Sequence, residues 1–170
     1  MSGCVAYRVE PSENFAQTYQ AVVATHYGVP ALQKALAEFQ SVVASYLSAF
    51  KNTARPSDSS AEPWPNRQPS TAQDGFECRK VRFRMPGLRG SATKGRLIYL
   101  VYESSCLIQP VWIYTHEEFD ARPPDRDLRD ALRDAIDRAA QYLEANPTVT
   151  LTASDGSKYE VEVRISDRRS

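Results

Sequence analysis

The chain has little of what identifies several common protein classes. Its 170 residues include seven glycines, three cysteines and two histidines, and 21 lysines and arginines are balanced by 21 aspartates and glutamates. Because the net charge is zero, overall charge predicts neither a nucleic-acid coat nor a membrane-surface protein. The sequence also lacks an apolar run near the roughly 18 residues of a membrane span. The remaining composition, 42% apolar and 25% charged, is typical of a soluble globular protein.

The three cysteines, Cys4, Cys78 and Cys106, are far apart in the sequence. An odd number without a Cys-x-x-Cys pair argues against a disulfide framework and against a zinc site. We therefore expect three reduced thiols in the protein core. The N-terminal residues lack the charged-then-apolar pattern of a signal peptide, so the expected location is the cytoplasm.

Sequence motifs for several kinds of catalysis are also absent. There is no Gly-x-Ser-x-Gly, no His-Glu-x-x-His and no Gly-x-Gly-x-x-Gly after a strand. The carboxylates gather on one amphipathic helix instead of around an identifiable pocket. These features argue against protease, glycosidase and dinucleotide chemistry. We expect no cofactor and no metal ion.

The first 50 residues predict a short strand at 5–9 followed by two helices. Ser12 begins the first helix, Gly28 ends it, and Pro30 begins a second helix that continues to Phe50. Apolar residues recur at helical spacing in both segments. Because the link is so short, the two helices should form an antiparallel hairpin.

Residues 52–75 are rich in proline and have no periodicity, which predicts a long mobile surface loop. Its Trp64 either pins the loop to the protein body or stacks on a nucleic-acid base. From Phe76 onward the apolar period becomes two, and three strands with short links predict an antiparallel meander ending at Thr115. Pro110 indicates a bulge or an edge position in the third strand.

A third helix begins at Asp125 or Asp127 and ends before Asn146. A hairpin with an Asp155-Gly156 turn follows. The expected fold class is therefore α+β, with two N-terminal helices packed on a mostly antiparallel sheet, a third helix and a C-terminal β-hairpin. We expect one domain at 1–145 and an appended hairpin at 146–170.

Local charge is the strongest functional signal. Between Cys78 and Tyr102 there is no acidic residue but there are seven basic ones: Arg79, Lys80, Arg82, Arg84, Arg89, Lys94 and Arg96. Three of them fall on one strand face at a period of two, where like charges repel. Either the acidic segment 117–144 of the same chain or a bound phosphate could neutralise them, and Arg guanidinium groups match phosphate oxygens well.

The two histidines differ in context. His26 lies near the end of the first helix, where capping is the ordinary role of a histidine. His116 directly follows the third strand of the meander and precedes Glu117 and Glu118. Imidazole titrates near neutral pH, and a neighbouring carboxylate would orient it for proton transfer. A plain surface histidine is the alternative.

Three segments carry a resemblance to a known family. They are RKVRFRMPG (79–87), GSATKGRLIY (90–99) and VWIYTHEE (111–118). They resemble the RelE/ParE toxin superfamily of bacterial toxin–antitoxin systems, and look closest to its HigB/RelE-like branch. In that branch a basic strand leads into a glycine- and lysine-containing loop, an Arg-x-Ile-Tyr strand and a tyrosine-containing third strand. The order of two helices before the sheet is also similar.

The resemblance implies a toxin that cleaves mRNA, free or on the ribosome, through attack of a ribose 2′-hydroxyl on the neighbouring phosphate. It implies catalytic roles for Arg96, Arg84, His116 and Tyr114, with His116 standing where a lysine is usual. The residues expected to bind RNA phosphates are Lys80, Arg82, Lys94 and Arg89. A cognate antitoxin is the expected protein partner. The alternative is a toxin-fold binding protein without catalysis, such as a ParE-like topoisomerase inhibitor or an inactive RNA-binding module.

Overall fold

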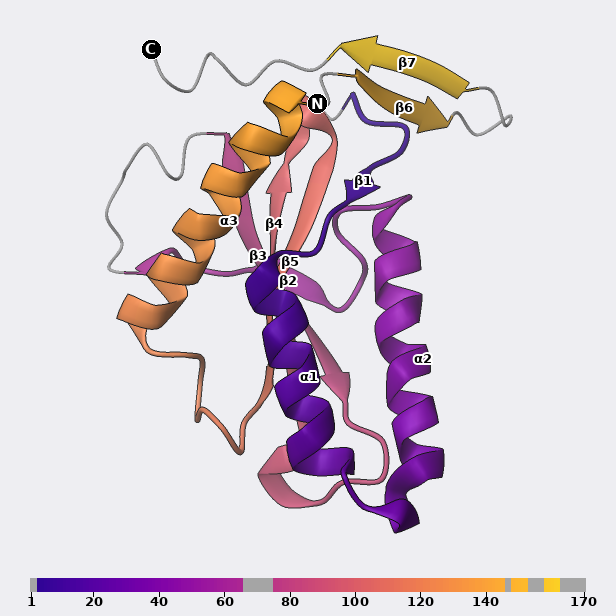
Figure 1. The fold of residues 1–170 in the computed structure, drawn as a ribbon, viewed down its shortest axis with the longest axis vertical. Helices are drawn as coiled ribbons and strands as arrows, with labels where there is room; N and C mark the ends of the chain where they lie inside the picture. The colour runs from indigo at the N-terminus through magenta and orange to yellow at the C-terminus, as the bar shows by residue number, and fades with distance from the viewer. Residues whose placement is uncertain (1–2, 66–74, 146–147, 153–157, 163–170) are drawn as a thin grey trace.

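The computed structural model describes residues 3–65, 75–145, 148–152 and 158–162. A β-sheet lies between helices, and the α+β class expected from the sequence is confirmed (Figure 1). The elements in chain order are β1 (Arg8–Val9), α1 (Glu13–Tyr27), α2 (Gln33–Phe50), β2 (Ser59–Ala61), β3 (Phe76–Arg84), β4 (Lys94–Tyr102), β5 (Leu107–Thr115), α3 (Asp125–Ala145), β6 (Thr148–Thr152) and β7 (Lys158–Glu162).

The main sheet has five strands in the order β1-β5-β4-β3-β2. Strands β3, β4 and β5 form the expected antiparallel meander, while β1 pairs with β5 in parallel. In the β4–β5 ladder Ile98 lies opposite Trp112 and Tyr99 lies opposite Pro110. Val111 is therefore an extra residue, and the bulge expected beside Pro110 is confirmed.

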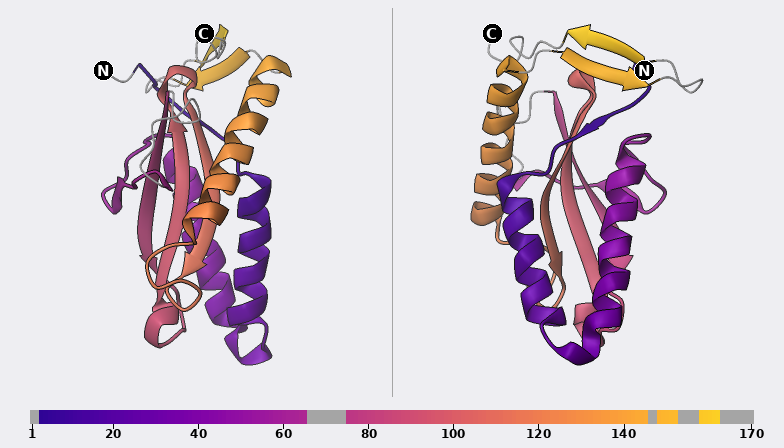
Figure 2. Two further views of the ribbon diagram at one scale, coloured as in Figure 1. Left: turned by 90° about the vertical axis from the view of Figure 1, so that its left-hand side faces the viewer. Right: turned by 45° about the vertical axis from the view of Figure 1, so that its right-hand side comes forward.

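Helices cover both faces of the sheet (Figure 2). Helices α1 and α2 pack on one face, around Phe39, Leu97 and Tyr99. Helix α3 packs on the other face, where its apolar side meets Ile98 and Leu100. Every residue from Leu97 to Tyr102 is at most 4% exposed. The sequence shows this two-sided burial as a nearly continuous apolar run.

The two N-terminal helices begin and end close to the expected residues. The Ser12 side chain caps α1 by accepting a hydrogen bond from the Phe15 amide at 3.1 Å. Gly28 follows the last turn, and Pro30 opens a short 3₁₀ turn that leads into α2. The two helices run antiparallel in space (Figure 1). None of the helices among the described residues is long and apolar enough to cross a bilayer.

The expected loop at 52–75 contains a strand, so this prediction is wrong in part. Strand β2 pairs with β3 in antiparallel register, with Ser60 opposite Lys80. Trp64 is half-buried against the core on the α3 face, which favours the pinning role. Residues 66–74 lie outside the described residues. Three residues of Ser and Ala give no strand signal of their own, because pairing with β3 fixes their conformation.

The C-terminal hairpin is present as the antiparallel pair β6–β7, which forms a separate two-stranded sheet. Its expected Asp155-Gly156 turn lies outside the described residues. The N-terminal strand is shorter than expected, because only Arg8 and Val9 pair with β5.

The expectation of three reduced cysteines is wrong. Cys4 and Cys106 form a disulfide, with their Cα atoms 5.6 Å apart. Cys78 remains a thiol, and burial raises its pKa to about 12. The two bonded cysteines are separated by 102 positions in the chain. The parallel pairing of β1 with β5 brings the two cysteines together, and no local sequence pattern indicates that pairing.

The Ser12 cap gives a stability prediction. Its hydroxyl accepts from the Phe15 amide and also donates to the Val111 carbonyl at 3.4 Å, so it joins α1 to β5. We expect Ser12→Ala to lose about 1–2 kcal/mol of unfolding free energy, seen as a lower urea midpoint with an unchanged slope. Ser41→Ala is the matched control, because Ser41 is exposed within α2 and alanine is the better helix former. Equal midpoints for the two variants would contradict the capping role.

Candidate functional site: a basic sheet face beside His116

Four cations meet on one face of the sheet at the end of the β3–β4 ladder. Arg82 lies directly opposite Arg96, and Arg84 lies directly opposite Lys94. Residues directly opposite in an antiparallel pair share a face, and so do residues two apart in one strand. We call Arg82, Arg84, Lys94 and Arg96 the basic face. Like charges placed directly opposite each other are destabilising, so this arrangement favours an external anion.

The basic face belongs to the side of the sheet that α3 covers elsewhere. The apolar residues of α3 pack on Cys78, Ile98 and Leu100, further along the same strands. In Figure 2 the connection between β3 and β4 extends beyond the end of α3. Arg82, Arg84 and Lys94 are exposed there, and Arg96 is half-buried. The cations therefore begin where the helical cover ends.

The charges of the basic face have no acidic partner within the described part of the chain. Arg82 donates from Nη1 to the Ser60 hydroxyl at 2.8 Å, and Arg96 donates from Nη1 to the Gly95 carbonyl at 2.7 Å. No described ion pair joins any of the four cations to a carboxylate. Partial burial, and then the charge of Arg82, lower the pKa of Arg96.

The acidic helix does not neutralise the basic face. In α3, Asp134 pairs with Arg138, four residues later, at 3.0 Å. Arg138 also reaches Glu13 of α1 at 2.7 Å. These described ion pairs hold α3 to itself and to α1. No described ion pair of the acidic segment 117–144 reaches the basic face, which favours the other source of negative charge that the sequence left open, an external anion.

His116 stands at the edge of the basic face. Its amide donates to the Lys94 carbonyl at 3.1 Å, which fixes the end of β5 against the start of β4. Partial burial is the largest cause of a lowered His116 pKa, followed by the charges of Arg96 and Lys94. Because cations disfavour a protonated imidazole, the side chain is neutral at pH 7 and able to accept a proton.

In the described contacts, the two glutamates that follow His116 do not interact with its side chain. Glu117 lies 3.5 Å and Glu118 3.4 Å from the ring nitrogens of His26. Glu118 also accepts a hydrogen bond from the Thr115 amide at 2.8 Å. His26 is buried, so it joins the end of α1 to the turn after β5 and is more than a helix cap. Asp120 is the acidic group that acts on His116, raising its pKa slightly against the larger effects.

Lys80 shares the predicted strand face with Arg82 and Arg84, but it is buried whereas those two are exposed. It is 9% exposed, and its Nζ lies 2.9 Å from Glu62 Oε1. The other oxygen of Glu62 accepts from Arg122 Nη1, also at 2.9 Å. Glu62 is buried too. This triad attaches the segment after β2 and the segment before α3 to the sheet.

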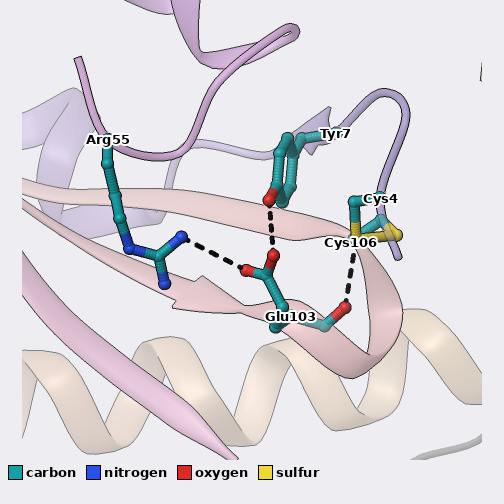
Figure 3. Close-up of a disulfide and its surroundings, with 5 residues drawn as sticks. All are labelled: Cys4, Tyr7, Arg55, Glu103 and Cys106. Atoms are coloured by element: carbon teal, nitrogen blue, oxygen red, sulfur yellow. Dashed lines mark hydrogen bonds and ion pairs between the residues drawn. A yellow bond between two sulfur atoms is a disulfide. The ribbon is translucent and has the colours of Figure 1, made fainter. Parts of the chain in front are cut away.

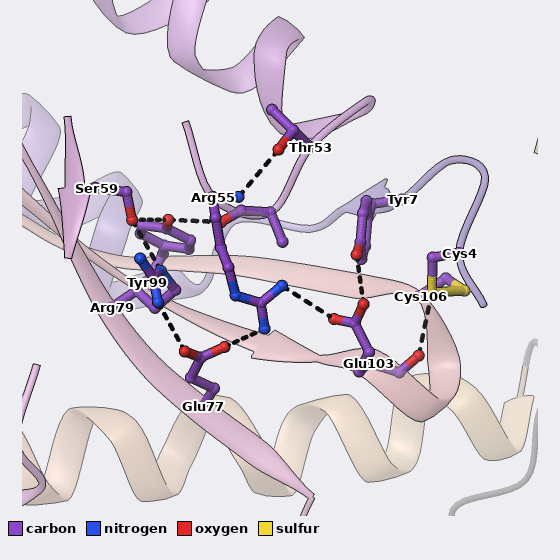
Figure 4. A network of polar contacts seen from close by, with 11 residues as sticks. Cys4, Tyr7, Thr53, Arg55, Ser59, Glu77, Arg79, Tyr99, Glu103 and Cys106 are labelled. Carbon is purple, nitrogen blue, oxygen red and sulfur yellow. Dashed lines mark hydrogen bonds and ion pairs between the residues drawn. A yellow bond between two sulfur atoms is a disulfide. The ribbon is translucent and has the colours of Figure 1, made fainter. Parts of the chain in front are cut away.

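The other predicted residues are distributed around the basic face. Tyr114 lies opposite Arg96 but is 1% exposed, and its hydroxyl donates to the Ala121 carbonyl at 2.9 Å. Burial raises its pKa further above neutrality. Arg89 is exposed in the connection between β3 and β4. Arg79 points to the opposite face of β3, where it binds Glu77 at 2.7 Å (Figure 4).

Two partners of the site were missed by sequence reasoning, Ser60 and Glu62. Both lie in the segment interpreted as a loop, and neither belongs to a periodic pattern. Their roles depend on the pairing of β2 with β3, which places them beside Arg82 and Lys80. A proline-rich stretch with no apolar alternation carries no signal from which that pairing could have been predicted.

A separate cavity of about 340 Å³ lies between α1 and α3. Its lining residues are Glu13, Asn14, Gln17, Trp112, Asp127, Asp130, Ala131 and Asp134. Four of these are acidic, and none belongs to the basic face. The candidate site is therefore an open sheet surface and not this cavity.

Comparisons with known proteins add no relative: the chain matches no protein-family model, no curated protein and no solved structure. The functional interpretation rests on the residues and their geometry.

The His116 environment gives a prediction for titration. We expect an imidazole pKa below the usual value of about 6.5, because the ring is partly buried beside Arg96 and Lys94. In Arg96→Ala a positive charge is removed, so protonation should become easier and the pKa should rise toward 6.5. NMR titration of the His116 ring protons measures both values. The control Arg133→Ala removes an exposed cation of α3, and a rise of similar size there would contradict the local cause.

The different environments of Lys80 and Arg84 predict different effects on stability. Lys80→Met keeps the apolar stem but removes the charge that binds buried Glu62. We expect it to cost about 1–3 kcal/mol of unfolding free energy in urea titrations. Arg84 is exposed and has no described ion pair, so Arg84→Met should stay within about 0.5 kcal/mol of the original protein. Equal losses would mean that both residues serve the fold.

Proposed function

We propose that the chain binds RNA through the basic face and cleaves it without a metal ion, as the toxin component of a toxin–antitoxin system. This proposal rests on two pairs of directly opposed like charges, Arg82 with Arg96 and Arg84 with Lys94. No described carboxylate neutralises either pair. A folded protein keeps such an arrangement where an anion is bound.

A nucleic-acid backbone fits this surface better than a small anion does. Arg82, Arg84 and Lys94 are exposed along two adjacent strands, so more than one phosphate can be contacted at once. Guanidinium groups bind phosphate oxygens in a bidentate manner. The neutral state of His116 at pH 7 adds a proton acceptor beside these cations. A ribose 2′-hydroxyl gives that acceptor a substrate, which favours RNA over DNA.

The proposed reaction is attack of the 2′-hydroxyl oxygen on the adjacent phosphorus. Neutral His116 takes the 2′ proton, the oxygen–phosphorus bond forms, and the bond to the 5′-oxygen of the next nucleotide breaks as that oxygen takes up a proton from water. The products are a 2′,3′-cyclic phosphate and a 5′-hydroxyl. Arg96 and Lys94 stabilise the charge that builds on the phosphate oxygens in the transition state.

The toxin role draws on the resemblance of segments 79–87, 90–99 and 111–118 to the RelE/ParE superfamily. The proposed partners are mRNA, free or on the ribosome, and a cognate antitoxin. An acidic, partly disordered antitoxin that folds over Arg82, Arg84, Lys94 and Arg96 would neutralise the charges that attract RNA. Induced expression should then arrest growth, and co-expression of the adjacent small open reading frame should relieve the arrest.

Binding without cleavage is the second candidate, and the state of Tyr114 favours it. The Tyr114 hydroxyl is buried and donates to Ala121, so it is not available to a substrate. His116 is then the one near-neutral proton carrier among the described neighbours of the basic face. If His116 does not act, the same surface serves as an RNA-binding module or as a binding protein for another acidic target.

The decisive experiment compares cleavage and binding in matched variants. His116→Gln keeps a hydrogen-bonding side chain but cannot titrate, so we expect cleavage to fall by about 10²–10⁴ with RNA affinity nearly unchanged. Arg96→Ala should reduce affinity and rate together. Arg84→Ala should weaken binding and lower the salt slope by about one. Arg133→Ala, on the exposed side of α3, should change neither.

Two further conditions test the reaction itself. Cleavage should persist in EDTA and should stop when the scissile nucleotide carries 2′-deoxyribose, since the attacking oxygen is then missing. Intact binding without cleavage in the original protein would support the second candidate. Absence of RNA binding at low salt would overturn both RNA cleavage and RNA binding, and would leave only a binding protein for another acidic target.

A further inference from the structure

A covalent bond fastens the N-terminal segment to the turn between β4 and β5. The Cys4–Cys106 disulfide joins the residues just before β1 to the turn that follows β4 (Figure 3). Cys106 has a positive φ of 48°, which is uncommon for a residue other than glycine. Both cysteines are only half-buried, so small thiols and disulfides can reach them.

The strand in the segment that the disulfide fastens is short. Strand β1 pairs with β5 at only two residues. Its flanking backbone bonds are Tyr7 N–H to the Lys51 carbonyl at 2.9 Å, Arg8 N–H to the Cys106 carbonyl at 2.8 Å, and Glu10 N–H to the Ile108 carbonyl at 2.9 Å. A two-residue strand at a sheet edge opens locally at low cost. Loss of the covalent bond should therefore be felt most in this segment.

The surroundings also suit the reduced pair. Cys4 Sγ lies 3.1 Å from the Glu103 carbonyl oxygen. In the disulfide that sulfur has no proton to donate, but as a thiol it finds an acceptor within reach. Tyr7 donates to Glu103 Oε1 at 2.6 Å, and Arg55 Nη1 lies 3.8 Å from Oε2. The Tyr7–Glu103 hydrogen bond does not involve either sulfur, so it is one attachment of the segment that the opening of the disulfide leaves in place.

The third cysteine is isolated from this chemistry. Cys78 is 3% exposed, beneath α3, on the face of the sheet that its neighbours Ile98 and Leu100 share. Its burial keeps it protonated, and a thiol without thiolate character neither attacks a disulfide nor reacts with an oxidant. Exchange is therefore confined to the two cysteines that already face each other.

We propose that Cys4 and Cys106 form a reversible redox site, opened and closed by thiol–disulfide exchange with a glutathione-type small thiol. In closing, the two protein thiols lose two protons and two electrons and form one S–S bond. One small disulfide takes up both and becomes two small thiols. Opening is the reverse. The half-buried positions of Cys4 and Cys106 and the Glu103 carbonyl acceptor 3.1 Å from the Cys4 sulfur are the observations that favour an exchangeable bond over a permanent one.

The redox site would control how firmly β1 stays paired with the outer edge of β5. This goes beyond the proposed RNA chemistry and does not depend on it. It also bears on the compartment in which the chain works, because a glutathione-exchangeable pair is reduced in a reducing cytosol and closed under oxidative conditions.

The test uses the original chain in glutathione buffers of varied ratio, with acid quenching and then N-ethylmaleimide labelling of the denatured protein. Mass spectrometry counts the labels. We expect one label, on Cys78, at the oxidised end and three at the reduced end, with a reversible transition between them. Three labels at every ratio would overturn the proposal. So would a single label that persists in a large excess of reduced glutathione, because the bond would then be permanent.

A second measurement locates the effect. Reduction should lower the melting temperature by roughly 5–15 °C and should increase tryptic cleavage after Arg8 several-fold. Cys4→Ser should show the reduced behaviour at every glutathione ratio. Cys78→Ala is the matched control: whatever its own stability, it should retain the redox difference in cleavage. Equal cleavage after Arg8 in oxidised and reduced protein would show that the bond does not fasten β1.

Discussion

Burial of the central strand β4 on both faces is the constraint on which the rest of the structure depends. From Leu97 to Tyr102 each side chain meets α1 and α2 on one side or α3 on the other. A stretch of strand buried in this way must be largely apolar, and residues 97–102 are. The three layers follow, because each helix has an apolar stripe that only a sheet face can cover. Beyond the N-terminal end of α3, the same strand becomes cationic at Arg96 and Lys94.

That change along one strand explains how a chain of zero net charge presents a basic surface. On β3, Lys80 and Arg82 are two residues apart and point to the same face, yet their surroundings differ. Lys80 meets the buried carboxylate of Glu62, whereas Arg82 meets the neutral hydroxyl of Ser60. Both partners come from one short segment, β2 and the residue after it. One glutamate therefore decides which cation supports the fold and which remains exposed.

A feature of the fold could be predicted from the sequence where the residues that indicate it lie close together in the chain. The Ser12 cap, the meander from Phe76, the bulge beside Pro110 and the start of α3 at Asp125 all follow from patterns within a few residues. The disulfide and β2 could not be predicted, because each requires pairing between distant segments. The grouping of Arg82, Arg84, Lys94 and Arg96 is intermediate. The alternation of side chains along each strand predicted a cationic face, but only the β3–β4 register places these charges directly opposite one another.

In the turn after β5, too, neighbouring residues face surroundings of different charge. Its two glutamates turn toward α1, where buried His26 lies between them, and Glu118 also binds the Thr115 amide that ends the strand. His116, one residue before them, stays with Lys94 and Arg96. Had either glutamate faced His116, it would have favoured the protonated ring and offset the cations. By engaging both carboxylates elsewhere, His26 keeps them from offsetting the cations, and partial burial together with the charges of Arg96 and Lys94 lowers the pKa of His116.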